Sequence, residues 1–405
     1  MIDRRGFFSL PAGILAASAL ERTLAAEPAR KIVLRSSWQT VNIGDIAHTP
    51  GMLALLERLR PDDRVTLWPG RLDDAVRRLL IARFPRLQLA ETPEAQRLAL
   101  GECDFFLHGS GPGLVGAREA ELARAAGKPY GFAGVTLSDE ELSKHRSLLE
   151  AARFVYCRDG DSLAALRKAG ISGPRNGFGP DATFALDLRD DPAADDLIRE
   201  KRLVPGEFLC AVPRLRWTPY WEIHPERNKP NPDRSAVNEA FADRDHAKMR
   251  AAIVAWVERL GRRVLLVPEM TYAVSRLRPL LFDPLPDHVK PAVEVVDRYR
   301  LTAEVASLYA RAAAVISFEM HSPIIAVSAG TPAILLRQPT DTRKGQMWRD
   351  IGLKDWIFEI DAAEGPAIAD RLLQVGRDLP AARETTRKAR DFASQRMAEM
   401  IAAIG

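Results

Sequence analysis

The stretch Val315–Gly345, VISFEMHSPIIAVSAGTPAILLRQPTDTRKG, decides the fold that the sequence predicts. Its apolar start predicts a short buried strand. Ser322 followed by Pro323 predicts a helix start, because the hydroxyl can cap free amides and the ring is pre-set for the first helical position. Gly330 can adopt the left-handed conformation that ends a helix, and the apolar run after it predicts a second strand. This order is typical of a strand–helix–strand unit in a parallel sheet.

His321 is expected at the mouth of the turn between the first strand and the helix. Free backbone N–H groups at a helix start bind anions, and α/β sheets bind ligands at this edge. His321 is therefore the leading candidate for a catalytic residue. The alternative is a structural histidine at a helix start, because many such turns only connect two elements.

Outward from this stretch, strand and helix patterns alternate along most of the chain. The alternation predicts the α/β class, with two doubly wound Rossmann-like domains that face each other across a cleft. Residues 187–201 are rich in Asp and Arg with little apolar pattern, so they are the best linker candidate. The expected divisions are an export signal at 1–26, an amino-terminal domain at 31–186, a linker at 187–205, a carboxy-terminal domain at 206–365 and a helical segment at 366–405.

The composition is that of an ordinary soluble globular protein, with 46% hydrophobic and 28% charged residues among 405. The net charge of +4 is small for this length and argues against a dedicated nucleic-acid binder. The three cysteines, Cys103, Cys157 and Cys210, lie far apart. We expect buried thiols, since their spacing indicates neither a disulfide framework nor a zinc site.

The amino terminus has the pattern of an export signal. Arg4 and Arg5 precede an uncharged, mostly apolar run, and small residues around Ala25 suit a cleavage site. The paired arginines with Phe7 and Phe8 resemble the twin-arginine class, whose cargo crosses the membrane folded. We therefore expect export to the periplasm or cell envelope. No later segment is apolar enough to span a bilayer, so no stable membrane span is expected after removal of the signal.

Two glycine-containing loops follow predicted strands. The first, around Gly44, places polar Asn42 and Asp45 at the carboxyl edge of the sheet. The second begins Gly109-Ser110-Gly111, and its glycines would let the phosphate or carboxylate of a ligand approach backbone amides. Its spacing is not that of the dinucleotide fingerprint. A polar loop like the first is most often just a turn, and the second can equally be a tight loop that packs under the helix.

Charged residues also follow predicted strands. Arg158 and Asp159 precede Ser162, and such a pair is often only a structural ion pair. Arg214 and Arg216 come directly after the strand predicted at 207–213, so they are expected to face the cleft. Arginine grips phosphate and carboxylate with two parallel hydrogen bonds, although solvated surface arginines are an equal alternative.

Together these residues resemble the polysaccharide pyruvyl transferase family, whose members look like two-domain proteins of the glycosyltransferase-B type. The likeness covers the chain from Lys31 to about Leu353. No single motif decides it, but the order and spacing of the motifs are fairly specific. They are Asn42, Gly44 and Asp45; Gly109 and Gly111; Arg158-Asp159 with Ser162; Pro180-Asp181; Glu304 and Tyr309; His321; Gly330-Thr331-Pro332; Lys344; and Gly352-Leu353.

The resemblance implies transfer of a pyruvyl group from phosphoenolpyruvate to hydroxyls of a cell-surface polysaccharide sugar, forming a cyclic ketal. Arg214 or Arg216 would hold the phosphate or carboxylate of the donor, and His321 would assist proton transfer. This scheme requires no metal ion and no organic cofactor. The expected partner is a polysaccharide or oligosaccharide acceptor, and the sequence leaves open whether the chain is a homo-oligomer. The implied substrate-binding residues are Asn42, Gly44, Asp45, Gly109, Ser110, Gly111, Arg158, Glu319 and Lys344.

The chain departs from the family pattern at Glu319, where the family usually has an arginine that contacts the donor. A carboxylate there would repel an anionic donor. Arg337 or Arg343 could substitute from the neighbouring loop. Export is a second departure, because phosphoenolpyruvate is a cytosolic metabolite. Both departures are consistent with a branch that has changed its donor or lost the transfer reaction.

Two alternative functions follow. The first is an exported glycan-binding protein that has lost transfer activity, in which Trp217, Tyr220 and Trp221 would stack on sugar rings. Such aromatics are as often core anchors. The second is a glycosyltransferase that uses a nucleotide sugar, which rests on fold analogy alone.

Overall fold

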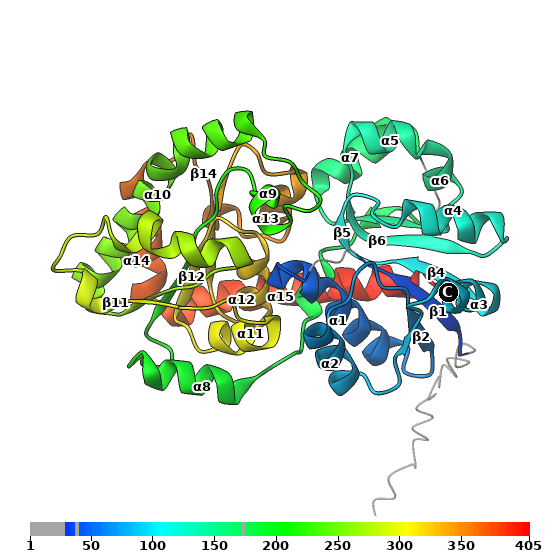
Figure 1. The fold of residues 1–405 in the computed structure, drawn as a ribbon, viewed down its shortest axis with the longest axis horizontal. Helices are drawn as coiled ribbons and strands as arrows, with labels where there is room; N and C mark the ends of the chain where they lie inside the picture. Colours follow the sequence, from blue (N-terminus) through cyan, green and yellow to red (C-terminus); the bar gives the residue numbers. More distant parts are fainter. Residues whose placement is uncertain (1–28, 37–39, 172–174) are drawn as a thin grey trace, which may run out of the picture.

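A computed structural model describes residues 29–36, 40–171 and 175–405 of the chain. Two parallel β-sheets lie in separate lobes, each with its own helices (Figure 1). The predicted α/β fold with two Rossmann-like domains is confirmed. The predicted export signal lies outside the described residues. Within the part that is described, no helix is both long and apolar enough to cross a membrane.

The amino-terminal sheet has the strand order β3-β2-β1-β4-β6-β7-β8, and β5 pairs with β6. The chain first builds outward from β1 to β3 and then returns to add β4 on the other side. This topological switch lies between β1 and β4, the usual place for a ligand in such sheets. The strands are β1 (Lys31–Arg35), β2 (Arg64–Leu67), β3 (Gln88–Leu89), β4 (Phe105–His108), β5 (Gly111–Pro112), β6 (Tyr130–Thr136), β7 (Val155–Cys157) and β8 (Gly177–Phe178).

The carboxy-terminal sheet has the order β11-β10-β9-β12-β13-β14, with its switch between β9 and β12. Its central strands are apolar and fully buried, as expected for parallel strands covered on both faces. The strands are β9 (Leu209–Val212), β10 (Val264–Leu266), β11 (Val293–Val295), β12 (Ala314–Ser317), β13 (Ala333–Arg337) and β14 (Ile357–Glu359).

The helices between the strands match most of the predicted pattern. In the first domain they are α1 (Ile43–Leu59), α2 (Asp74–Arg83), α3 (Pro93–Glu102), α4 (Ala117–Ala125), α5 (Asp139–Lys144), α6 (Arg146–Glu150) and α7 (Gly160–Lys168), with the 3-10 turn η1 (Ala182–Ala185). Beyond it come α8 (Asp191–Glu200), α9 (Tyr220–Ile223), α10 (Pro232–Leu260), α11 (Thr302–Ala310), α12 (His321–Ser328), α13 (Gln346–Asp350), α14 (Gly365–Arg377) and α15 (Leu379–Ala402). The short turns there are η2 (Thr271–Arg276), the π-helical η3 (Arg278–Phe282), η4 (Lys290–Ala292), η5 (Arg343–Gly345) and η6 (Lys354–Trp356).

The last helix ties the two domains together. In Figure 1, α15 runs from the carboxy-terminal lobe across to the amino-terminal one. It packs on α12 in one domain and on α1 and η1 in the other. The Tyr156 hydroxyl donates to the carbonyl of Glu399, and the Arg30 guanidinium donates to that of Ile404. The segment predicted simply as helical is therefore shared between both domains.

Three local predictions differ from the structure. The expected linker contains α8, which packs on α11 with Leu197 and Ile198 buried. Its apolar residues lie on one face, so the helix is amphipathic despite its acidic composition. The helix predicted at 247–260 begins at Pro232, because Asn231 caps it within the stretch expected to be irregular. The third difference concerns Ser322.

Ser322 does not cap α12, which already begins at His321. The Ser322 hydroxyl and backbone N–H both donate to the carboxylate of Glu269, at 2.6 and 2.7 Å. The helix start therefore already holds an anion from the protein itself. The expectation of free N–H groups beside His321 was wrong at this position, because a sequence does not reveal a carboxylate supplied by another strand.

Candidate functional site

The candidate site lies where the carboxyl edges of the two sheets meet. His321 follows β12, and Glu269 follows β10, which lies on the other side of β9 in the same sheet. From the other domain, Asp45 and His48 lie on the first turns of α1. The backbones join directly: Ile43 N–H donates to the carbonyl of Glu269 at 3.2 Å. The site is therefore built from both domains at their contact.

His321 is held by Glu269. One carboxylate oxygen of Glu269 lies 3.2 Å from Nδ1 of His321, and the other accepts both Ser322 hydrogen bonds. Burial alone would raise the pKa of Glu269, but the His321 and Ser322 contacts outweigh burial and lower it. An ionised Glu269 can only accept, so Nδ1 of His321 carries a proton and donates to it. Nε2 is buried and has no hydrogen-bond partner among the described residues.

His48 is held in the same way from the opposite domain. Its Nδ1 lies 2.9 Å from Asp181 and 2.7 Å from the Ser110 hydroxyl. Arg158 donates to the other oxygen of Asp181 at 2.6 Å. Burial would raise the pKa of Asp181, but His48 and Arg158 together hold it well below its usual range. Burial lowers the pKa of His48, so its imidazole is neutral near pH 7, with Nε2 buried and unpartnered among the described residues.

The two imidazoles meet across the domain contact. Their ring centroids are 5.1 Å apart and their planes are nearly perpendicular, at 89°. Gly44 makes this approach possible, since a Cβ on it would lie 2.0 Å from Cγ of His321. The Asp45 carboxylate is 6% exposed and makes no hydrogen bond or ion pair with the residues that the structure describes. One ring nitrogen from each histidine and one carboxylate oxygen of Asp45 lie within 4.8 Å of one another.

A second cluster of charged residues, Arg214, Glu319 and Asp341, lies close to His321. Arg214 makes an ion pair with Asp341, and its Nε lies 3.4 Å from Glu319. Burial raises the pKa of Glu319 to about 8, against the opposing effect of Arg214. Lys344 acts electrostatically on both Glu269 and Glu319, and its side chain has no ion-pair partner in the described part of the chain.

The structure brings together only some of the residues proposed from the sequence. Gly44, Asp45 and His321 are in one cluster, joined through Asp181 to Ser110 and Arg158. Asn42 caps α1 by accepting from the N–H groups of Gly44 and Asp45. Arg216 instead belongs to a separate group, bound to Asp245 through two hydrogen bonds of 2.8 and 2.9 Å and stacked on Phe241.

Gly109 and Gly111 of the glycine loop have neighbours other than the histidines. The two arginines that could have replaced an arginine at position 319 pair with other carboxylates. A Cβ on Gly109 would meet the hydroxyl of Ser36, and Gly111 is part of β5. Arg337 pairs with Glu359, and Arg343 pairs with Asp139. The guanidinium nearest Glu319 therefore comes from Arg214.

His48 and Glu269 are the residues that sequence reasoning missed. His48 had a signal, because it follows Asp45 by three residues and so shares its helical face. Glu269 comes three residues after β10, at the ligand-binding edge of the sheet. Neither signal identifies the partner, since the partner of each residue lies far away in the sequence.

The aromatic loop is mostly used for packing. Arg234 stacks on Trp217 at 4.4 Å, and Tyr220 packs against the cluster around Leu215 and Met270. Trp221 lines a surface pocket of about 330 Å³. The loop therefore offers one aromatic side chain to a groove, rather than the three considered from the sequence.

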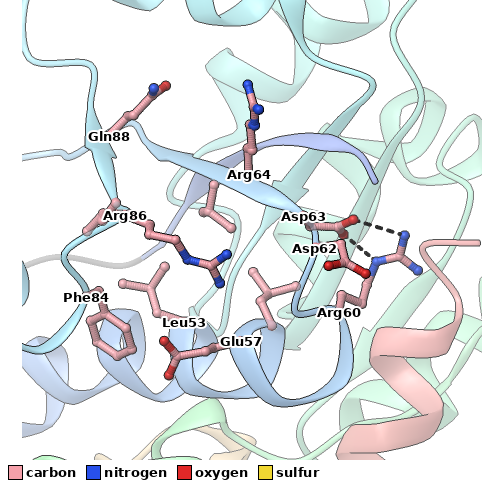
Figure 2. Close-up of a pocket in the computed structure, with 12 residues that line it drawn as sticks. Leu53, Glu57, Arg60, Asp62, Asp63, Arg64, Phe84, Arg86 and Gln88 are labelled. Atoms are coloured by element: carbon pink, nitrogen blue, oxygen red, sulfur yellow. Dashed lines mark hydrogen bonds and ion pairs between the residues drawn. The ribbon is translucent and has the colours of Figure 1, made fainter. Parts of the chain in front are cut away.

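The surface pockets lie away from the histidines. A pocket of about 460 Å³ is lined by the end of α1 and the starts of β2 and β3, with Arg60, Asp63 and Arg86 around it (Figure 2). The starts of parallel strands form the edge opposite to the one that usually binds ligands. His321 is 4% exposed and lines none of four pockets of about 330–550 Å³. The expectation that His321 faces an open gap is thus not met.

Comparisons with known proteins agree on family and fold. A family model described as polysaccharide pyruvyl transferase matches residues 42–338. Among curated proteins, none matches the chain. Similar solved structures include Anabaena HepE in complex with UDP, with 12% identity, a TM-score of 0.53, and coverage of 92% of this chain and 97% of that one.

Two further structures share the fold. UDP-GlcNAc 2-epimerase from Neisseria meningitidis, bound to UDP-GlcNAc, has 10% identity and a TM-score of 0.56, covering 92% of this chain and 99% of that chain. UGT2 of Phytolacca americana, complexed with UDP-2-fluoro-glucose and pterostilbene, has 13% identity and a TM-score of 0.56, covering 92% and 98%. At such identities the likeness concerns the fold alone, which is glycosyltransferase-B-like.

Proposed function

Because the chain belongs to the polysaccharide pyruvyl transferase family, we propose that it transfers a pyruvyl group from phosphoenolpyruvate to sugar hydroxyls of a cell-surface polysaccharide. The observation that carries this proposal is the family match over residues 42–338, which includes His321 and most of the motif series. Export is part of the proposal: it would place the enzyme with an acceptor in the cell envelope, and the cytosolic donor phosphoenolpyruvate would then have to reach it there.

His321 is assigned to proton transfer at Nε2. Glu269 fixes the tautomer and orientation of the ring, as a carboxylate does for a general base in other enzymes. One sugar hydroxyl oxygen bonds to the enol carbon of the donor, and its proton passes by way of Nε2 to the methylene carbon, which becomes a methyl group. A second hydroxyl oxygen bonds to the same carbon as the carbon–oxygen bond to phosphate breaks, and the proton of that hydroxyl leaves with the inorganic phosphate.

Lys344 is assigned to the negative charge of the donor. Arg214 and Arg216 already pair with buried carboxylates, so neither guanidinium is free to neutralise an anion. Lys344 is half-buried, lies within electrostatic reach of Glu269, and pairs with no described carboxylate. An unpaired cation beside the proton-transferring histidine suits a donor that carries both a phosphate and a carboxylate.

Substrate entry requires the two domains to separate. His321 and His48 are in ring contact across the domain boundary, and both are buried. Two-domain enzymes commonly open by hinge motion to admit substrates and close to exclude water. The arrangement described is accordingly the closed one.

Phosphate release tests the proposal. The full-length chain is incubated with phosphoenolpyruvate and a galactose- or mannosamine-containing oligosaccharide, in the presence of a metal chelator. We expect phosphate release together with a ketal product seen by mass spectrometry. His321→Asn should slow release by at least about 100-fold, the usual contribution of a general acid or base.

His246→Asn is the matched control. His246 is also fully buried, with Nδ1 bonded to the Ala242 carbonyl and Nε2 unpartnered among the described residues, but it lies outside the cluster. This variant should retain the rate. Release from the unchanged chain that does not exceed the His321→Asn level would reject transfer from phosphoenolpyruvate.

A further inference from the structure

We propose that Asp45, His48 and His321 form a binding site for one divalent transition-metal ion, with zinc as the model ligand. One potential ligand atom from each of the three side chains lies within 4.8 Å of the other two. It is the only such group of histidine, cysteine or carboxylate ligands found in the described ranges. The site goes beyond the proposed transfer reaction, which requires no metal.

One ring nitrogen of each histidine is left without a partner. Nε2 of His48 and Nε2 of His321 are both buried without a hydrogen-bond partner among the described residues. An unpaired buried polar atom is costly, so two in one cluster are unexpected unless something binds them. Each ring has its Nδ1 beside a carboxylate, which leaves Nε2 as the nitrogen available to a metal ion.

A carboxylate holds the other ring nitrogen of each histidine. Metal-binding histidines almost always donate the other N–H to a carboxylate, which fixes the ring and makes it more basic. Asp181 provides this support for His48, and Glu269 provides it for His321. Both carboxylates are fully buried. The same arrangement thus occurs twice, from two different domains, around one point.

The local charge also favours a cation. Asp45 has no lysine or arginine within ion-pair distance among the described residues, whereas Asp181 has Arg158 and Glu269 lies within electrostatic reach of Lys344. The buried Asp45 carboxylate thus leaves negative charge that a divalent cation would balance. Two imidazoles with one carboxylate favour zinc, iron, nickel or copper, whereas magnesium and calcium prefer oxygen ligands.

The geometry requires only a small closure. Tetrahedral zinc binds nitrogen and oxygen ligands at about 2.0–2.2 Å, which places neighbouring ligand atoms about 3.4 Å apart. The three ligand atoms must therefore approach one another by no more than about 1.5 Å. Asp45 lies in the first turn of α1 and is not held by a described partner, so its side chain is free to turn towards the rings. Three protein ligands leave one tetrahedral position open.

Zinc titration tests the site directly. The full-length chain, stripped with a chelator, is titrated with Zn²⁺ against a chromophoric competitor, without any substrate. We expect one Zn²⁺ per chain, a visible Co²⁺ spectrum of a four- or five-coordinate ion, and no comparable binding of Mg²⁺. Because substrates are absent, the result is independent of the transfer assay, which runs in the presence of chelator.

Substitutions identify the ligands. His48→Asn and His321→Asn should each weaken Zn²⁺ binding by at least about 100-fold, and Asp181→Asn by about 10–100-fold, as for other supporting carboxylates. His246→Asn should leave the affinity within about twofold. Asp45→Asn removes a ligand charge but keeps the shape of the side chain, which is not completely buried. This variant therefore tests the site if a histidine variant does not fold. The proposal fails if no stoichiometric Zn²⁺ binds, or if these cluster variants bind as His246→Asn does.

Discussion

His48 and His321 stand edge to face at 5.1 Å, although they lie 273 positions apart in the sequence and belong to different domains. Each ring is anchored through Nδ1 by a buried carboxylate and leaves Nε2 bare. The chemistry proposed for this protein therefore depends on how its two domains meet.

Gly44→Ala should disturb the domain contact. The added Cβ would lie 2.0 Å from Cγ of His321, so either the ring or the domain must shift. We expect a loss of about 1–3 kcal/mol in the free energy of unfolding, as for other overpacked sites, measured by urea denaturation.

Gly101→Ala is the control for this substitution. A Cβ there meets nothing within 4 Å, and Gly101 lies in helix α3. It should be neutral or stabilising by up to about 1 kcal/mol, because alanine restricts the unfolded chain. Equal effects of the two substitutions would contradict the close approach of Gly44 to His321.

Arg158→Ala should destabilise the protein strongly. Arg158 is 1% exposed and donates to Asp181 and to the Thr136 hydroxyl. Removing one partner of a buried pair leaves an uncompensated charge, which costs about 3–5 kcal/mol. Arg158→Lys keeps the charge and should lose less. A urea midpoint unchanged in Arg158→Ala would show that Asp181 does not depend on this arginine.

Stability should fall between about pH 6.5 and pH 4 because of His108. Burial lowers the pKa of His108 to about 4, and the neutral ring is satisfied on both sides, by the Gly109 carbonyl at Nδ1 and the Gly116 N–H at Nε2. The unfolded chain takes up a proton near pH 6.5, so acid favours unfolding. The contribution of neutral His108 to the free energy of unfolding is fully present above about pH 6.5. It falls by about 2 kcal/mol as the pH is lowered to 5.

His108→Gln tests the assignment of this pH dependence. The variant removes the titrating group and should reduce the change in unfolding free energy between pH 7 and pH 5 by about 2 kcal/mol. Burial also lowers the pKa of His246 to about 4, so His246 should still make the stability of the variant depend on pH in the same range. A pH dependence that is the same in His108→Gln as in the unchanged protein would exclude His108 as its source.

Zinc should inhibit pyruvyl transfer. A metal ion on Nε2 of His321 occupies the lone pair that is proposed to accept the proton, so both cannot happen together. One equivalent of Zn²⁺ should stop phosphate release, and a chelator should restore it. Faster release with zinc would instead show that His321 does not act as the base.

Arg4 and Arg5 should direct export. Changing both to lysine keeps the charge but removes the twin-arginine pair, so we expect the protein to remain in the cytoplasm. Cell fractionation with an antibody against the chain measures this. Export at an unchanged level would mean that the pair is not the signal.

The alternation of strand and helix patterns was enough to predict two Rossmann-like domains, because each element's apolar period is local in the sequence. The position of His321 after a buried strand was predictable for the same reason. Local pattern was less informative in 187–205, where α8 packs on α11 through the buried residues Ala194, Leu197 and Ile198 and through ion pairs of Arg311 with Asp191 and Asp195.

Only the tertiary structure decided what surrounds His321. Glu269 holds the ring and fills the helix start, His48 approaches from the other domain, and Arg214 is taken up by Asp341 and Glu319. These contacts join residues from separate strands and helices. The charge of a side chain and the apolar period of its segment can be read from the local sequence. The partner of that side chain depends on how the sheets twist and pack against each other.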